Sequence, residues 1–519
     1  MHEGPGPWVV WLGCLLLARP DTGAECRPVW CDGGRPGKGA YEAIDVLRAA
    51  EEQGLAPHDY DVNRLESLAR TLASGPLPAP SELGAFDAAL GASLLRYLSD
   101  LGGGRVDPRD VGFGYGAVER LATNELLSRV TTASSLTSVV ASLEPGFTQY
   151  RRLKDALARY RSLARDLAPP ALAEERGVHE GEPYAEASRL ARLLRAMGDL
   201  PEGAAFEEGT GVYAGPLREA VVRFQARHGL DPDGVLGPAT LQRLNVPFSQ
   251  RVRQIELALE RLRWLPRPPP GRFVVVNIPA FRLVGFESMA DERPAVQMGV
   301  VVGRAARTRT PLFFQEMRYL IFHPSWYPPR SIIRNEIVPE LRQDRGYLEA
   351  QAMDAVASAE DDAPALAVGE DTAALLEAGL VRIRQRPGAR NALGLLKFVL
   401  PNAYDVYLHD TPATGLFARA RRDFSHGCIR VEDPVALAEF VLAGSDDWTG
   451  QRIERAMHGG RTLRVDLGAP VPVFIYYTTT IVRADGRIEF YDDVYGLDRA
   501  LDAALRARVE APTAHPLDP

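Results

Sequence analysis

Residues 404–431 read YDVYLHDTPATGLFARARRDFSHGCIRV, and this stretch holds both His409 and Cys428. A thiol attacks a carbonyl carbon only as the thiolate, so a catalytic cysteine needs a proton acceptor and N–H donors for the oxyanion that forms. His409 can accept the proton, and the backbone N–H groups of His426, Gly427 and Cys428 can serve as the donors. The stretch therefore predicts a cysteine active site.

The residues around Cys428 also carry a family resemblance. SHGCIR, preceded by a histidine in the context YLHDTP, resembles the catalytic motif of the large, multidomain periplasmic L,D-transpeptidases with a YkuD-like catalytic domain. The resemblance implies that Cys428 is the nucleophile and His409 the base, with His426 and Gly427 in the same site. It leaves two roles for His426, which either orients the thiol or holds the loop by hydrogen bonds.

Four further residues are candidates for substrate binding. Along a strand that includes Tyr407 and His409, alternation puts both side chains on one face, so Tyr407 can line the cleft. Trp326 is a second candidate wall, and core packing is the alternative for both aromatic residues. Arg430 either binds a carboxylate of the substrate or braces the loop through an internal pair. Ser425 either contacts substrate or bonds the backbone at the turn.

Length and composition indicate a multidomain α+β protein. The chain has 519 residues, of which 46% are hydrophobic and 25% charged, which suits about three soluble domains. The expected parts are a helical scaffold domain, a small three-helix peptidoglycan-binding-like domain, a β-rich catalytic domain with a helical capping insertion, and a C-terminal extension. The scaffold domain is expected at 37–180 and the peptidoglycan-binding-like domain at 184–247. The catalytic domain is expected at 271–480, with the insertion at 330–390, and the extension at 481–519.

Local patterns support these divisions. Helical spacing joins Ala43, Ile44, Leu47 and Ala50, and likewise Leu90, Leu94, Tyr97 and Leu98. RFQARHGLDPDGVLGPAT, at 223–240, resembles the recurring text of the peptidoglycan-binding domain, although a helical module without retained affinity fits as well. Short β-rich segments at 272–278, 281–286, 295–302, 318–322, 396–400 and 406–409 predict a sandwich or a barrel-like domain. Asp433 and Pro434 predict the start of a helix.

The first residues predict export to the periplasm. An apolar stretch at 8–18 is too short to span a bilayer, and small residues follow it, so 1–24 reads as a signal peptide. Because no Lys or Arg precedes the stretch, an uncleaved anchor is the alternative. In an oxidising compartment Cys26 and Cys31 can close a short loop, which leaves Cys428 unpaired.

Charge and motif content limit the classes of molecule that this protein is expected to bind. A net charge of −8 argues against nucleic acid as a bulk partner. The resemblance implies peptidoglycan stem peptides as substrate, transient contacts with other wall-synthesis proteins, acylation by carbapenems and no cofactor. It implies 3→3 cross-linking with release of terminal D-alanine, and water or a lipoprotein are alternative acceptors. Two other classes stay open: a zinc site formed by His409, His426 and Cys428, and a non-catalytic wall-binding scaffold.

Overall fold

The computed structural model divides into two compact units. The first comprises Met1–Arg267 with Thr478–Pro519, and the second comprises Pro268–Tyr477. The structure describes residues 29–115, 120–167, 171–173, 177–204, 211–266, 270–360, 363–444 and 447–510. The predicted signal peptide and Cys26 lie outside the described residues, so the signal peptide and the pairing of Cys26 with Cys31 stay predictions. No helix in the described ranges is both long and apolar enough to cross a bilayer.

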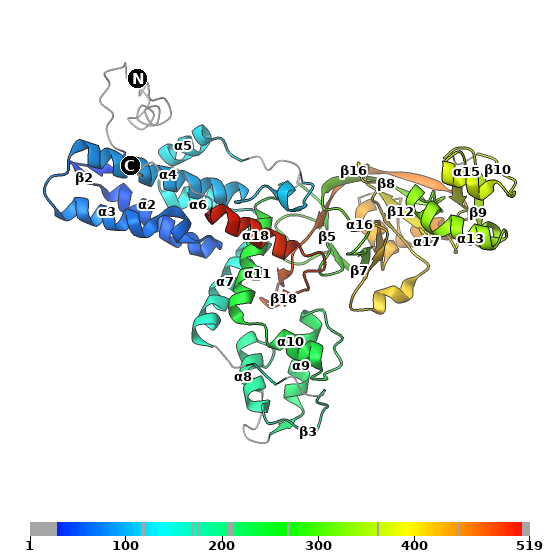
Figure 1. Ribbon diagram of the computed structural model, residues 1–519, viewed down its shortest axis with the longest axis horizontal. Helices are drawn as coiled ribbons and strands as arrows, with labels where there is room; N and C mark the ends of the chain where they lie inside the picture. Colours follow the sequence, from blue (N-terminus) through cyan, green and yellow to red (C-terminus); the bar gives the residue numbers. More distant parts are fainter. Residues whose placement is uncertain are drawn as a thin grey trace, which may run out of the picture. The chain divides into compact units, whose positions relative to one another are not determined.

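The first unit begins with a bundle of helices (Figure 1). The bundle forms because apolar residues recur at helical spacing and share one core. Both predicted stripes are buried, which confirms the helical pattern at these positions. The elements are β1 (Cys31–Asp32), β2 (Arg35–Pro36), α2 (Lys38–Arg48), η1 (Ala49–Gln53), η2 (Pro57–Tyr60), α3 (Val62–Ser74), α4 (Pro80–Gly103), η3 (Pro108–Val111), α5 (Thr123–Thr132), α6 (Leu136–Leu143) and α7 (Thr148–Asp166).

A three-helix segment follows in the same unit. It contains β3 (Glu182–Pro183), α8 (Ala187–Met197), β4 (Val212–Tyr213), α9 (Pro216–Arg227) and α10 (Pro238–Leu244). Proline at the first position starts both α9 and α10, because the missing proline N–H has no helical partner there in any case. Gly198, at φ +83°, ends α8 in the left-handed conformation that glycine adopts without strain.

The C-terminal residues complete the first unit. The long helix α11 (Phe248–Leu262) packs against α7, and β17 (Thr480–Val482), β18 (Ile488–Phe490) and α18 (Leu497–Glu510) follow much later in the chain. Arg227 in α9 donates to the carbonyl of Ile488 at 2.8 Å, and Arg508 pairs with Asp100 at 2.8 Å. These contacts tie the last described residues to the helical bundle and to the three-helix segment.

The second unit is built on a nine-stranded sheet. The strand order is β14-β7-β15-β13-β12-β8-β16-β5-β6, and β6 also pairs with β7, so the eight strands from β7 to β6 close into a ring, and β14 pairs with β7 outside it. Of the two predicted architectures, the barrel-like one is therefore confirmed. The strands are β5 (Phe273–Asn277), β6 (Arg282–Phe286), β7 (Val296–Gly303), β8 (Phe314–Phe322), β12 (Leu396–Val399), β13 (Leu408–His409), β14 (Asp423–Ser425), β15 (Ile429–Val431) and β16 (Leu463–Tyr476).

Helix α16 follows β15, the strand that begins directly after the nucleophile candidate Cys428. Asp433 accepts a hydrogen bond from the N–H of Ala436 at 2.9 Å and caps α16 (Pro434–Leu442), which confirms the predicted helix start. Besides α16, the described residues of the second unit outside the insertion form η5 (Thr414–Ala418) and α17 (Gly450–His458). Because β15 leads directly into the capped helix, the residues before β15 are fixed from that side.

The capping insertion has its own hydrophobic core, and its elements gather together at one end of the second unit (Figure 1). They are α12 (Arg330–Ile332), η4 (Ile333–Ile337), α13 (Val338–Gln343), α14 (Tyr347–Ala350), β9 (Met353–Val356), β10 (Ala365–Leu366), α15 (Thr372–Ala378) and β11 (Arg382–Gln385). The strands form a three-stranded antiparallel sheet in the order β10-β9-β11. The sequence indicated helices here and gave no sign of this sheet.

Candidate active site

Three neighbouring strands set the geometry of the site. Strand β13 pairs in parallel with β15, with His409 opposite Arg430, and pairs antiparallel with β12, with Lys397 opposite His409. Residues paired across neighbouring strands project from the same face of the sheet. The side chains of His409, Arg430 and Lys397 therefore share one face, and the buried Leu408 and Ile429 occupy the other.

Cys428 lies two residues before Arg430, and Tyr407 lies two residues before His409. Because side chains alternate along a strand, both project from the same face. Cys428 directly precedes β15, and its Sγ lies 3.7 Å from the carbonyl oxygen of Asp405. The backbone and the hydroxyl of Tyr407 both form hydrogen bonds with the sulfur. The indole N–H of Trp326, which can only donate, bonds the hydroxyl of Tyr407 in turn. A chain of hydrogen bonds thus runs from Trp326 through Tyr407 to the thiol of Cys428.

The protonation of His409 follows from its surroundings. The ring is 4% exposed, and Nδ1 lies 2.6 Å from the carbonyl oxygen of Asp410. Since a carbonyl oxygen can only accept, Nδ1 carries the proton and Nε2 keeps its lone pair. Burial, followed by the charges of Arg430 and Lys397, lowers the pKa of His409 to about 3. The imidazole is therefore neutral near pH 7 and has one nitrogen free to accept a proton.

The thiol is neutral at rest as well. Burial raises the pKa of Cys428, and the hydrogen bonds from Tyr407 oppose that shift only in part. Cys428 and His409 thus form a pair of neutral groups and not a thiolate–imidazolium pair. Loss of the thiol proton must accompany the attack on a substrate.

The loop before Cys428 is held by a short hydrogen-bond network. The hydroxyl of Ser425 donates to the carbonyl of Cys428 at 2.6 Å and accepts from the N–H of Gly427 at 3.1 Å. Thr310 donates to the carbonyl of Gly427 at 2.8 Å. Gly427 has φ +124°, a conformation that residues with a side chain rarely adopt. Ser425 thus bonds the backbone at the turn.

This network decides which amides can stabilise an oxyanion. The N–H of Gly427 is already donated to Ser425, which departs from the prediction that it acts as a donor. The amides of His426 and Cys428 have no acceptor within the part of the chain that the structure describes. They are the two N–H groups available for the oxyanion.

His426 reaches the insertion. Its Nε2 lies 2.6 Å from Oε1 of Glu336, which belongs to η4. This contact joins the loop of the nucleophile candidate to the capping insertion. Trp326 makes a second link, because it bridges to Gln385 of β11 and packs against the core of the insertion.

The side chain of Arg430 is half-buried and has no hydrogen-bond or ion-pair partner among the described residues, so the predicted internal pair is not seen. Burial and the charge of Arg304 lower the pKa of Arg430. Arg304, which follows β7 and is exposed, likewise has no side-chain partner in the described ranges. Two guanidinium groups near the thiol are therefore free for an anionic ligand.

Several residues of the site were not predicted from the sequence. Lys397 places its Nζ 3.8 Å from the ring centroid of Tyr407, and alternation along the predicted strand could have identified it. Arg304 stands at the end of a predicted strand, a common position for binding residues. Glu336 and Thr310 come from distant segments and carried no local signal.

The zinc alternative requires His409, His426 and Cys428 to converge. Nδ1 of His409 faces the carbonyl of Asp410, and His426 is engaged by Glu336. Among the residues that the structure describes, no group of three or more His, Cys, Asp or Glu side chains is placed to hold a metal ion. The three residues thus do not form a ligand set.

Comparison with known families identifies three parts of the chain. Residues 271–475 match the YkuD model, an L,D-transpeptidase catalytic domain, and residues 23–157 match a scaffold domain. Residues 185–244 match the model described as "Putative peptidoglycan binding domain". The first match contains His409, Cys428 and the insertion.

Individual proteins are also similar. A protein of Haemophilus influenzae named "Putative L,D-transpeptidase" is 30% identical over 259 residues, which cover 49% of this chain and 50% of the relative. The chain thus spans about half the length of that curated relative. A crystal structure of an L,D-transpeptidase from Stackebrandtia nassauensis aligns at 13% identity and a TM-score of 0.25, and covers 60% of this chain and 97% of that one. The family matches and the similarity to the Haemophilus influenzae protein show that the chain carries a YkuD-type L,D-transpeptidase catalytic domain at 271–475, together with a domain of the putative peptidoglycan-binding family at 185–244.

Proposed function

We propose that this protein is a periplasmic L,D-transpeptidase that forms 3→3 cross-links between peptidoglycan stem peptides by cysteine acyl transfer. One observation carries the proposal. The neutral, buried His409 and the thiol of Cys428 lie on one face of the neighbouring strands β13 and β15. Diagonal neighbours on adjacent strands have Cβ atoms roughly 7 Å apart, a span that an imidazole and a thiol side chain together bridge.

The first half-reaction acylates the enzyme. The sulfur of Cys428 attacks the carbonyl carbon that joins residue three of a donor tetrapeptide to its terminal D-alanine, and the thiol proton moves to Nε2 of His409. The amides of His426 and Cys428 receive the oxyanion. When the tetrahedral intermediate collapses, the C–N bond breaks, and His409 returns the proton to the departing amine. D-alanine leaves and a thioester remains on Cys428.

The second half-reaction transfers the acyl group. The side-chain amine of residue three in a second stem attacks the thioester, and His409 takes a proton from that amine. The C–S bond then breaks, and the proton passes to the sulfur. The products are the 3→3 amide and the free thiol, so the enzyme returns to its starting state.

Two arginine side chains without anionic partners favour a peptide substrate that carries carboxylates. Arg430 and Arg304 lie near Cys428 without anionic partners of their own, and a guanidinium group binds a carboxylate with two parallel hydrogen bonds. Trp326 and Tyr407 form a wall beside the sulfur. The insertion, joined to the loop by Glu336 and His426, is placed to limit the access of water to the thioester.

The test is turnover of a defined donor. Wild-type protein, Cys428→Ala and Cys31→Ser are incubated with disaccharide tetrapeptide, and D-alanine release and dimer formation are followed by mass spectrometry. We expect D-alanine, dimers linked between third residues, and an acyl adduct at Cys428 in the wild type and in Cys31→Ser. All three products should be absent in Cys428→Ala. A carbapenem should form a covalent adduct with the same dependence on Cys428.

Other outcomes separate the alternatives. D-alanine release without dimers would identify an L,D-carboxypeptidase, and dimers formed only with a lipoprotein acceptor would identify an attachment enzyme. A wild-type protein that forms no product and no adduct at Cys428 would refute the proposal and favour a wall-binding scaffold. Retained activity in Cys428→Ala would refute the assignment of the nucleophile.

A further inference from the structure

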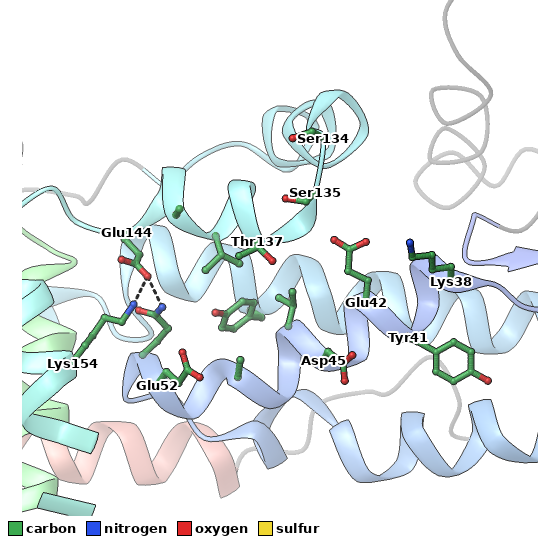
Figure 2. Close-up of a pocket in the computed structure, with 16 residues that line it drawn as sticks. Lys38, Tyr41, Glu42, Asp45, Glu52, Ser134, Ser135, Thr137, Glu144 and Lys154 are labelled. Carbon is green, nitrogen blue, oxygen red and sulfur yellow. Dashed lines mark hydrogen bonds and ion pairs between the residues drawn. The ribbon is translucent and has the colours of Figure 1, made fainter. Parts of the chain in front are cut away.

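The helical bundle of the first unit holds a cavity of about 810 Å³ that the proposed reaction does not use (Figure 2). Helix α2 and η1 line one side, and residues 134–144 line the other, with Tyr97 of α4 and Lys154 of α7 completing the wall. Binding sites for small ligands have volumes of about 300–1,000 Å³. The cavity is therefore large enough for a peptide of a few residues.

A tyrosine hydroxyl at the cavity has no hydrogen-bond partner among the described residues. Tyr97 is only 1% exposed and lines the cavity, yet its hydroxyl makes no hydrogen bond with any described residue. The ring is fixed by an edge contact with Tyr60, whose centroid lies 5.3 Å away. Because Tyr97 lines the cavity and its hydroxyl is not used by a described acceptor, it offers an O–H donor to a ligand carbonyl.

A second cavity, of about 300 Å³, lies beside the first and shares Glu42, Ser134 and Ser135 with it. Asp87 lines this second cavity and is fully buried. Its carboxylate accepts from the backbone of Trp30, through Oδ1 at 2.6 Å, and from the backbone of Val29, and Oδ2 has no partner within hydrogen-bond distance among the described residues. Asp87 thus offers a buried acceptor to an N–H group.

Two of the carboxylates in the larger cavity are already bonded. Glu144 accepts from Nζ of Lys154 and from Nε2 of Gln53, both at 2.5 Å, and Figure 2 shows these two bonds as dashed lines. Oε1 of Glu42 accepts the N–H of Leu136 at 2.9 Å. These contacts brace the cavity walls against each other and leave those carboxylates less available to a ligand.

The remaining charged groups of the cavity indicate which charges its ligand carries. Asp45 pairs with Arg48 at 2.6 Å, whereas Glu52 makes no ion pair with a described residue. Lys38, at the start of α2, has no described ion-pair partner either. A free carboxylate and a free ammonium in one cavity favour a ligand that carries both charges.

We propose that this cavity binds a short peptide with a free ammonium group and a free carboxylate. A peptide carbonyl would accept from Tyr97, the ligand ammonium would pair with Glu52, and the ligand carboxylate would pair with Lys38. A part of the peptide that enters the neighbouring second cavity would donate an N–H to Asp87. A phosphate or nucleic acid would place negative charge beside Glu52, and a neutral glycan would leave both charges unpaired. The choice of an uncross-linked stem peptide as this ligand rests on the proposed function.

The test uses the full chain with Cys428→Ala and a tripeptide stem that is acetylated at its N-terminus and ends at a diamino acid, so that the side-chain amine is its one free amine. This probe lacks the terminal D-alanine, so it is not an acyl donor. Carbodiimide coupling, mapped by mass spectrometry, should join the probe amine to Glu52. Hydrogen exchange should slow in residues 38–53 and 134–144. The same tripeptide with an acetylated side-chain amine is the matched control, and it should show neither effect.

Two single substitutions test whether Tyr97 and Glu52 contribute to tripeptide binding. Tyr97→Phe removes one hydroxyl and keeps the ring, and Glu52→Gln removes one exposed charge, so both should fold as the parent does in thermal unfolding. Each should weaken tripeptide binding about fivefold, the effect of one lost hydrogen bond or charge contact. Equal binding of the acetylated probe, unchanged affinity in both variants, or protection by glycan strands without stems would overturn the proposal.

The experiments distinguish failure of the proposed peptide site from failure of the proposed reaction. D-alanine release by the wild type without protection of the cavity would refute the peptide site alone. Protection of the cavity without D-alanine release would refute the proposed reaction alone.

Discussion

The hydroxyl of Tyr407 is the most direct means of testing how the thiol of Cys428 is activated. It bonds the sulfur and is itself bonded by the indole of Trp326. A hydrogen bond to a charged group contributes about 1.5–3 kcal/mol, so its loss in Tyr407→Phe should cost the developing thiolate about 2 kcal/mol. That cost corresponds to about 30-fold in the rate of a reaction through the thiolate.

Alkylation measures this effect without a wall substrate. Iodoacetamide modifies the thiolate, and mass spectrometry quantifies modification at Cys428 across a range of pH. Because burial raises the pKa of Cys428, its alkylation in the wild type should rise at a higher pH than that of an ordinary cysteine. In Tyr407→Phe the rate at neutral pH should fall further, by about 30-fold.

Cys31 provides a control within the same molecule. Burial, with a contribution from Asp87, raises the pKa of Cys31 to about 11, and this residue lies in the other unit. Its modification should be slow and unchanged in Tyr407→Phe. If Cys428 in the variant is alkylated with the wild-type pH dependence, the hydroxyl does not activate the thiol and the reasoning is refuted.

Further predictions concern four residues. Because the pKa of His409 is lowered to about 3, the imidazole stays neutral down to about pH 4, so kcat/KM for D-alanine release should show no acid inflection near 6.5. An inflection there would mean that His409 is exposed to solvent during the reaction. Arg430→Gln should lower kcat/KM about tenfold for stems with free carboxylates and much less for amidated stems. Ser425→Ala should destabilise the protein by about 1–3 kcal/mol in denaturant unfolding, since two bonds inside a buried turn are lost. Glu336→Gln should change stability by less than about 1 kcal/mol, because its pair with His426 is exposed, and should speed hydrogen exchange in residues 330–345.

The sequence predicted the elements whose signals are local. The cap at Asp433 and most strands of the second unit follow from residue type and alternation. Strand β16 was missed because its sequence contains Gly468, Pro470 and Pro472, which normally argue against a strand. The structure accommodates them with a shift of register against β8 between Asp466 and Val471.

The composition of the site was harder to predict than its motif. The thiol and the imidazole share one short stretch, whereas Lys397 joins them only through the register of β12 against β13. Glu336 meets His426 only because the insertion folds on its own core. Contacts of this kind depend on pairings between distant segments, and no local pattern encodes them.

The neutral state of the pair has a consequence for the proposed reaction. The burial that would keep water from a thioester also disfavours charge on both groups, so it raises the pKa of Cys428 and lowers that of His409. A thiol held in the neutral form reacts slowly with oxidants, because oxidation proceeds through the thiolate. In an oxidising compartment this would protect the unpaired Cys428 between turnovers. The proton would leave only when a bound carbonyl carbon stabilises the sulfur, so activation is tied to the presence of substrate.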